Sequence, residues 1–344
     1  MKRLLIFILI GLISGLLFVL YFDYYLKPDN KFFVAAANKG DSWTQKLRAE
    51  STEPCYVITG GSEIRMGINP AIILQDSGTR LLNAAGQAGF GYRCNIVHAL
   101  NYLQPGDTLI INVRSTVFDH HKTIPNGLKY CWQRMGTKTF SSDLIPPTID
   151  NIAKLLQGSS AEISLFIIKM LATPDSIYKY DSQTIIHETG WIENQYKTQL
   201  PKPPVANGDL SEALSISVET KEFLNTVKKE CDKRGAKLCT YFYAAYADQS
   251  YYPHAVATAL TLTRHGIPVV RDEVMGLDSS EDSFADTPLH LSPEGSRTHS
   301  IRLGRILSSE QKFWTEAELV DKLHSMGYND SGVKLPLTSS PAGK

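Results

Sequence analysis

The chain has 344 residues, 43% of them hydrophobic, which is enough for one large domain or two small ones with a real core. Its 35 Lys and Arg residues balance its 35 Asp and Glu residues, so the formal net charge is zero. No block of basic residues stands out, which argues against nucleic acid as the main partner.

The N-terminus has the pattern of a membrane anchor. Lys2 and Arg3 precede an uncharged apolar run over residues 4–22, which is long enough to span a bilayer as a helix. The two cations predict a cytoplasmic N-terminus and an extracytoplasmic remainder, either periplasmic or at the cell surface. Residues 34–37 (Val-Ala-Ala-Ala) are compatible with signal cleavage, but they lie well beyond the apolar run. We therefore expect residues 1–25 to be an uncleaved, single-pass anchor.

The rest of the chain divides into a tether, a domain and a tail. We expect residues 26–50 to be a polar tether with a short helix, and residues 51–310 to form the domain. An insertion is expected at about 114–214, and residues 311–344 are expected to form a C-terminal helix and tail.

Apolar runs alternate with helical patterns along the domain. Hydrophobic spacing predicts helices at 92–103, 149–156, 215–234 and 254–265, and apolar runs predict strands at 55–59, 80–85, 108–113, 237–243 and 268–270. Residues 163–171 fit either a helix or a strand, with the helix preferred. Such alternation predicts an α/β fold with a mostly parallel sheet that is covered on both faces.

A glycine-lined turn follows the first predicted strand. Gly60 and Gly61 precede Ser62, and a helix is expected to start at Asn69 with Pro70 at its first position. Ser62 therefore lies just past a strand end, where open α/β sheets bind ligands. The alternative is a tight strand-to-helix turn in which the serine only caps the helix.

A second pair of polar residues lies near the C-terminus. Ser292 and Pro293 predict a helix start, which places His290 in the preceding loop with Asp286 four residues upstream. If the loop turns back on itself, the carboxylate can orient the imidazole as a general base. The alternative is two ordinary polar loop residues.

These parts together resemble the SGNH (GDSL-like) hydrolase superfamily. The blocks that carry the resemblance are 60–62, 83–91 and 286–295, and it covers residues 55–308 apart from much of the insertion. The segment 286–291 (Asp-Thr-Pro-Leu-His-Leu) is similar to membrane-anchored bacterial members associated with the acylation of cell-surface polysaccharide or cell wall.

The resemblance implies a three-layer α/β/α sandwich of flavodoxin-like type that needs no cofactor or metal. In it Ser62 is the nucleophile, His290 the base and Asp286 its orienting partner. The superfamily's third block, Gly-x-Asn-Asp, is absent here, and Asn112 to Ser115 follow the third strand instead. The expected oxyanion donors are the N–H groups of Ser62 and Gly86, with the side chains of Asn112 or Arg114 as further candidates.

The expected function is that of a serine esterase or O-acyltransferase acting on an acylated extracytoplasmic glycan or cell-envelope polymer. The absent third block motivates an alternative, a catalytically silent SGNH-like accessory domain that binds a glycan or a membrane acyltransferase partner. An anchored structural protein is the third and least favoured hypothesis.

Five cysteines, at 55, 94, 131, 231 and 239, fit no zinc motif. Cys231 and Cys239 are the nearest candidate disulfide pair in an extracytoplasmic domain, although helix–strand geometry can forbid such a bridge.

Other polar and aromatic residues have a structural and a functional interpretation. His120 with His121 suits a loop better than a metal site. The remaining residues, for which packing or surface exposure is the default and a role at the site the alternative, are His98, His187 with Glu188, Tyr246, Tyr251 and Tyr252.

Overall fold

The structure, a computed structural model, describes residues 31–86, 91–113, 135–157, 184–203 and 205–335, with isolated positions at 11, 14–15, 128–129 and 131–132. Within those residues no helix has the length and apolar character needed to cross a membrane. Apart from positions 11, 14 and 15, the predicted anchor at 4–22 lies outside the described residues.

A parallel sheet lies at the centre of the domain. Its strands are β1 (Tyr56–Thr59), β2 (Leu81–Asn83), β3 (Thr108–Val113) and β6 (Lys237–Phe242), in the order β2-β1-β3-β6 with every neighbouring pair parallel. The expected strand at 268–270 forms two isolated bridges instead, a parallel one between Val269 and Thr240 and an antiparallel one between Val270 and Phe313. The mixed α/β fold with a mostly parallel sheet is thus confirmed.

The order of the strands defines where ligands bind. The chain leaves β1 for β2 at one side and then crosses back over β1 to β3. In open α/β sheets the crevice at such a switch point, outside the carboxyl ends of the strands, is the usual ligand site. The turn that follows β1 therefore lies at this switch point, at the carboxyl edge of the sheet.

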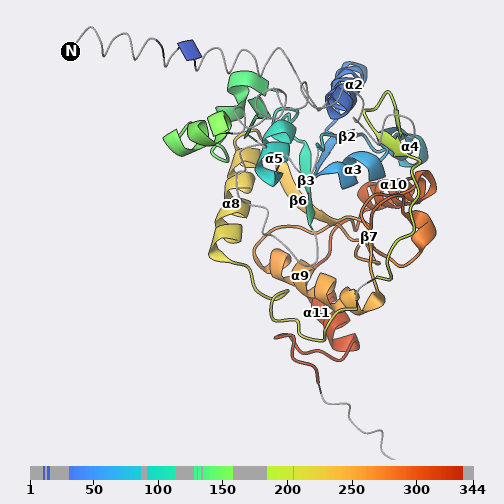
Figure 1. The fold of residues 1–344 in the computed structure, drawn as a ribbon. Coiled ribbons are helices and arrows are strands. Elements are labelled where there is room, and N and C mark those ends of the chain that lie inside the picture. The colour runs from blue at the N-terminus through green and yellow to red at the C-terminus, as the bar shows by residue number, and fades with distance from the viewer. Residues whose placement is uncertain are drawn as a thin grey trace, which may run out of the picture.

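Helices cover both faces of the sheet (Figure 1). One face packs against α3 (Ser62–Gly67), α4 (Pro70–Ser77) and α10 (Pro293–Ser308), where Ile110 meets the cluster of Ile73 and Leu303. The other packs against α5 (Tyr92–Leu100) and α8 (Val218–Asp232), where Leu109 shares a cluster with Leu224. Side chains of successive strand residues point to opposite faces, so the apolar runs of the sequence feed both clusters.

The remaining elements surround this core. The helix α9 (Tyr252–Arg264) follows β6, and α11 (Glu316–Ser325) packs on it. The short strands and single turns of 3₁₀-helix are β4 (Thr184–Ile186), β5 (Ile192–Asn194), β7 (Ala245–Tyr246), β8 (Leu277–Asp278), η3 (Gly136–Phe140), η4 (Gln249–Tyr251) and η5 (Glu281–Ser283).

Two helix starts follow the predicted chemistry. Asn69 caps α4 by accepting the N–H of Ala71, and Ser292 caps α10 by accepting the N–H of Gly295, each with proline at the first helical position. The six-residue helix α3, between the Ser62 turn and α4, was not expected from the sequence.

The segment expected to be a tether is instead part of the domain. Residues 31–50 form a 20-residue helix, α2 (Lys31–Glu50), in which Ala36, Ala37 and Leu47 are buried. Arg48 from its last turn pairs with the fully buried carboxylate of Asp107. The sequence does not reveal the buried face of α2, because the residues on that face are mostly small and lie among many polar residues. The domain therefore begins about twenty residues earlier than expected.

The described parts of the insertion lie against the core at two places. The predicted helix at 149–156 is present over 149–157, whereas 163–171 lies outside the described residues. The strands β4 and β5 form an antiparallel hairpin.

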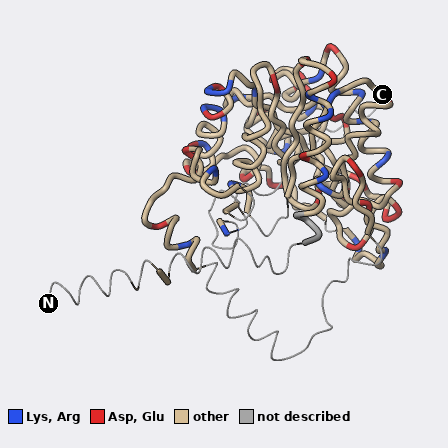
Figure 2. The backbone as a smooth tube through the Cα atoms, turned by 90° about the horizontal axis from the view of Figure 1, so that it is seen from above, with Lys and Arg blue, Asp and Glu red and all other residues tan. Residues whose placement is uncertain are grey.

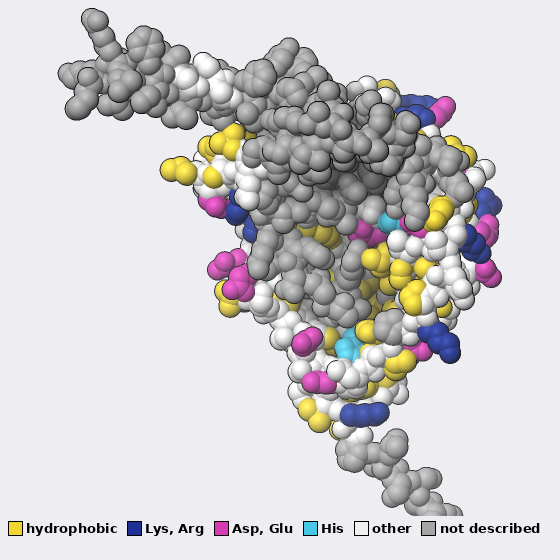
Figure 3. All heavy atoms as spheres, in the orientation of Figure 1, with side chains coloured by type: hydrophobic (Ala, Val, Ile, Leu, Met, Phe, Trp, Pro, Cys, Tyr) yellow, Lys and Arg dark blue, Asp and Glu magenta, His cyan; other side chains and the backbone are white. Residues whose placement is uncertain are grey.

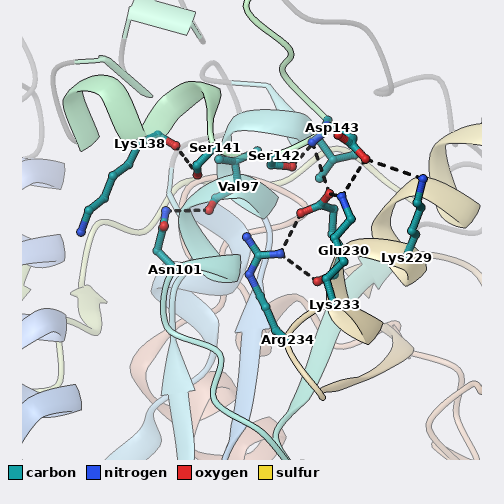
Figure 4. Close-up of polar contacts among 11 residues, drawn as sticks. Val97, Asn101, Lys138, Ser141, Ser142, Asp143, Lys229, Glu230, Lys233 and Arg234 are labelled. Atoms are coloured by element: carbon teal, nitrogen blue, oxygen red, sulfur yellow. Dashed lines mark hydrogen bonds and ion pairs between the residues drawn. The ribbon is translucent and has the colours of Figure 1, made fainter.

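The segment at 141–145 is held to α8 by Glu230, whose side chain is 1% exposed (Figure 4). Glu230 accepts from Lys233 Nζ at 2.6 Å, Arg234 Nη1 at 2.7 Å and the N–H of Asp143 at 3.3 Å. Burial raises the pKa of Glu230, but these hydrogen bonds outweigh it and leave the pKa below its usual value.

The cysteine pairing differs from the expected one. Cys94 on α5 forms a disulfide with Cys131, whose Cα lies 5.7 Å away, whereas Cys55, Cys231 and Cys239 are free and buried. The pairing of Cys231 with Cys239 is wrong because Cys231 packs in the cluster on one face of the sheet and Cys239 in the cluster on the other.

Charged residues of both signs are interspersed over the domain (Figure 2). On the face shown in Figure 3, charged side chains lie mostly at the margin and hydrophobic side chains gather further in.

Candidate active site

Ser62 is the first residue of α3, directly beyond the carboxyl end of β1. The N-cap position belongs to Gly61, and no side chain caps this helix. The hydroxyl of Ser62 instead lies 2.9 Å from Nε2 of His290. A Cβ on Gly60 would press against Ile64 and Asn112, so glycine is needed there for the tight turn. Ser62 is therefore not the simple helix cap of the alternative hypothesis.

His290 is held between Ser62 and Asp286. Its Nδ1 lies 2.9 Å from Oδ1 of Asp286, and the two side chains are 12% and 9% exposed. The loop turns back on itself as required, because the N–H of His290 donates to Thr287 Oγ1 and the N–H of Ala285 donates to the His290 carbonyl. A carboxylate only accepts, so Nδ1 carries the proton and Nε2 is left to accept from the Ser62 hydroxyl.

Two of the predicted oxyanion donors are engaged elsewhere. The N–H of Gly86 donates to the carbonyl of Gly60 at 3.1 Å. Asn112 donates from Nδ2 to Glu63 Oε1 at 3.0 Å and accepts the N–H of Tyr243 at 3.3 Å. In this conformation the Gly86 N–H is therefore an internal hydrogen-bond donor, and one of the two N–H groups of the Asn112 amide is taken by Glu63.

The remaining predicted donor is the N–H of Ser62. It occupies the first turn of α3, where N–H groups have no acceptor within the helix. Arg114 lies outside the described residues.

The helix that carries Ser62 also carries two buried charged side chains. Glu63 is 3% exposed and accepts the N–H of Gly61 at 3.0 Å, which fixes the turn before Ser62. Arg65 is 1% exposed and donates to the carbonyls of Asn83 at 2.9 Å, of Gly190 at 3.3 Å and of Ala85. The guanidinium thus joins α3 to the end of β2 and to the insertion. Neither residue was expected at the site from the sequence; the available signal was a pair of charged residues on either side of Ile64.

Asn194, on β5 of the insertion, also reaches the site. It is 1% exposed, and its Nδ2 donates to Oδ1 of Asp286 at 2.7 Å. The two residues are 92 positions apart in the chain. No motif surrounds Asn194, so no sequence signal could have found this contact.

The other histidines of the sequence analysis have structural partners. His98 is buried, with Nδ1 3.3 Å from the Ala84 carbonyl and Nε2 3.1 Å from the hydroxyl of Tyr102. His187 pairs with Glu193 at 2.8 Å on the hairpin and lies against the ring of Trp191. Neither forms a described contact with Ser62 or Asp286.

The candidate tyrosines have structural partners. Tyr246 packs on Phe284, whose centroid lies 5.5 Å away, while Tyr251 lies against His254 and Tyr252 donates to the Glu273 carbonyl. Among the described residues no group of three or more His, Cys, Asp or Glu side chains is arranged to hold a metal ion. His120 and His121 lie outside those residues.

No protein-family model, no curated protein and no solved structure matches this chain. The geometry of Ser62, His290 and Asp286 therefore carries the functional argument.

Proposed function

We propose that this chain is an SGNH-type serine esterase or O-acyltransferase that acts on an acylated extracytoplasmic glycan or cell-envelope polymer. One observation carries the proposal, the unbroken chain of hydrogen bonds from Ser62 Oγ through the His290 ring to Asp286, with 2.9 Å at each step. Nucleophile, base and orienting carboxylate in this order constitute the apparatus of nucleophilic acyl transfer.

In the first half-reaction Ser62 Oγ attacks the acyl carbonyl carbon while His290 Nε2 takes the hydroxyl proton. The carbonyl oxygen becomes an oxyanion, for which the Ser62 N–H is the proposed donor. The ester C–O bond then breaks, and the proton on His290 passes to the departing alkoxide. The acyl group remains on Ser62 as an ester.

In the second half-reaction His290 Nε2 takes a proton from the acceptor hydroxyl, whose oxygen attacks the carbonyl carbon of the acyl-enzyme. The bond between that carbon and Ser62 Oγ then breaks, and the proton on His290 returns to Ser62 Oγ. Water as acceptor gives an esterase, and a sugar hydroxyl gives an O-acyltransferase. Asp286 stabilises the imidazolium that forms in both halves. Because the first half-reaction is shared, the site supports either outcome.

Two features support an extracytoplasmic, membrane-anchored location. The apolar run at 4–22 has the length of a bilayer span and follows two cations. The disulfide between Cys94 and Cys131 belongs to an oxidising compartment, since cytosolic thiols are kept reduced.

A second candidate is a catalytically silent accessory domain that binds a glycan or a membrane acyltransferase partner. Two observations favour it: the Gly86 N–H donates to the Gly60 carbonyl, and one Asn112 N–H donates to Glu63. Loss of one oxyanion donor costs about 10²- to 10³-fold in turnover.

Labelling of the full chain in mild detergent with a fluorophosphonate probe decides between the two functions. We expect labelling of the wild type that is lost in both Ser62→Ala and His290→Ala. Lys197→Ala is the matched control, because its exposed side chain pairs with the exposed Asp282 near the same loop. Absence of labelling in the correctly folded wild type would establish the silent domain.

A further inference from the structure

We propose that Asn194 is a positioning residue of the Ser62 site, so that the β4–β5 hairpin of the insertion is an integral part of the catalytic apparatus. This inference rests on the proposed function and extends it by one residue beyond the triad. It concerns how the orienting carboxylate is itself held.

The contact between Asn194 and Asp286 is short and largely buried. Nδ2 of Asn194 lies 2.7 Å from Oδ1 of Asp286, the same oxygen that faces His290 Nδ1 at 2.9 Å. Asn194 is 1% exposed, and its own Oδ1 accepts the N–H of Tyr196 at 3.0 Å, which fixes the orientation of the amide. An amide so fixed presents an N–H, and not an oxygen, to the carboxylate.

The hairpin is itself fastened to the helix that carries Ser62. Trp191 Nε1 donates to the Met66 carbonyl at 2.6 Å, and Arg65 donates to the Gly190 carbonyl at 3.3 Å. The nucleophile and the residue that holds the carboxylate thus share one rigid support. A shift of the hairpin would move both ends of the Ser62–His290–Asp286 chain.

The segment that follows β5 runs along the loop that carries Asp286. Thr198 donates from its N–H to the Ala285 carbonyl at 3.2 Å and from Oγ1 to the Asp286 carbonyl at 3.1 Å. Further along, the N–H of Leu200 donates to Glu281 Oε1 at 3.1 Å. Asp286 is therefore held by the insertion through both its backbone and its side chain.

The consequence for the reaction is one of geometry. Two donors converge on one carboxylate oxygen, so the Asp286 carboxylate is fixed in rotation and His290 meets it at a single angle. Removal of the Asn194 donor takes away one of the restraints on the carboxylate and lets His290 turn away from Ser62. Loss of a supporting hydrogen bond of this kind lowers reactivity by about tenfold to hundredfold.

The test compares three variants by their rates of fluorophosphonate labelling. Asn194→Ala is expected to label about tenfold to hundredfold more slowly than the wild type. Gln195→Ala, at the neighbouring exposed residue whose side chain donates to the half-buried Glu193, is expected to label at the wild-type rate. Labelling of Asn194→Ala within twofold of the wild type would overturn the inference.

Asn194→Asp adds a readout that a merely structural role would not change. The substitution keeps the shape of the side chain but places an acid against Asp286. Labelling is expected to be strongly suppressed at pH 8 and to recover relative to the wild type as the pH falls, because the protonated acid can again donate. An Asn194→Asp profile parallel to that of the wild type would contradict the inference.

A third measurement separates this inference from the proposed function. The downfield proton resonance of His290 Nδ1–H, identified by its loss in His290→Ala, is expected to shift or broaden in Asn194→Ala and to stay in place in Gln195→Ala. This holds whether or not the protein turns over substrate. A wild type that fails to label would refute the enzyme, whereas an unchanged resonance in Asn194→Ala would refute the positioning role.

Discussion

Replacement of Asp286 by Asn gives the most informative test of the site. The His290 Nδ1–H and Asn194 Nδ2–H donors both point at Oδ1 of this residue. A carboxamide that keeps its oxygen at this position satisfies both donors, whereas the reversed amide would turn its own N–H groups toward them. We therefore expect the oxygen to stay, and the tautomer of His290 to stay with it.

The remaining loss in Asp286→Asn is that of the negative charge. Two unit charges about 4 Å apart attract by about 4 kcal/mol at the effective dielectric constant of 20 that suits protein sites. Partial exposure of both side chains reduces this figure to about 3 kcal/mol, which corresponds to roughly a hundredfold slower reaction. A triad in which the same substitution fixes the wrong tautomer loses about 10⁴-fold.

The assay is the rate of fluorophosphonate labelling of Asp286→Asn, alone and combined with Asn194→Ala. We expect about a hundredfold loss for the single substitution. In the Asn194→Ala background the amide is free to reverse, so the penalty for Asp286→Asn is expected to grow by about a further tenfold. A loss of 10⁴-fold or more in the single variant, unaffected by Asn194→Ala, would refute this reasoning.

Three further predictions concern stability and cysteine reactivity. Glu230→Gln is expected to lower the unfolding free energy by about 2 kcal/mol at neutral pH, as measured by urea denaturation. Because the folded-state pKa of Glu230 is lowered, this contribution to stability is present above the unfolded pKa of about 4.3 and is lost as the pH falls through the folded value. The unfolding free energies of the wild type and Glu230→Gln should therefore converge in acid. A difference between them that does not change with pH would contradict this prediction. Gly190→Ala is expected to lower the unfolding free energy by several kcal/mol, because the new Cβ would collide with the Ala36 carbonyl. Gly78→Ala is the control, since Gly78 has a similar positive φ in open space, and it should cost about 1 kcal/mol. Equal decreases in melting temperature for the two variants would refute the packing argument. Burial raises the pKa of Cys231 to about 12, so iodoacetamide at pH 8 should leave it unmodified in the native protein, and mass spectrometry showing rapid alkylation would contradict its burial.

Local patterns in the sequence were sufficient to predict most of the sheet and all three residues of the Ser62–His290–Asp286 chain. Ser62 is placed at a strand end by features that lie close to it in the sequence: the strand before it, the glycine turn, and the helix start at Asn69 and Pro70. Asp286 and His290 are four residues apart, before a helix start that is equally visible. Helix caps, turns and buried strands depend on neighbouring residues, and for this reason the sequence alone predicts them.

Contacts between distant segments depended on the tertiary structure. Cys55, Cys94, Cys131 and Cys231 all belong to one buried cluster, and the pairing of Cys94 with Cys131 depends on the 5.7 Å separation of their Cα atoms. The helix α2 is revealed as part of the domain only by the burial of its small residues. The engagement of Gly86 by Gly60 and the reach of Asn194 to Asp286 likewise join segments whose proximity no local pattern encodes. Local sequence sets the conformation of each segment, but the order of strands in the sheet and the path of the insertion decide which side chains meet.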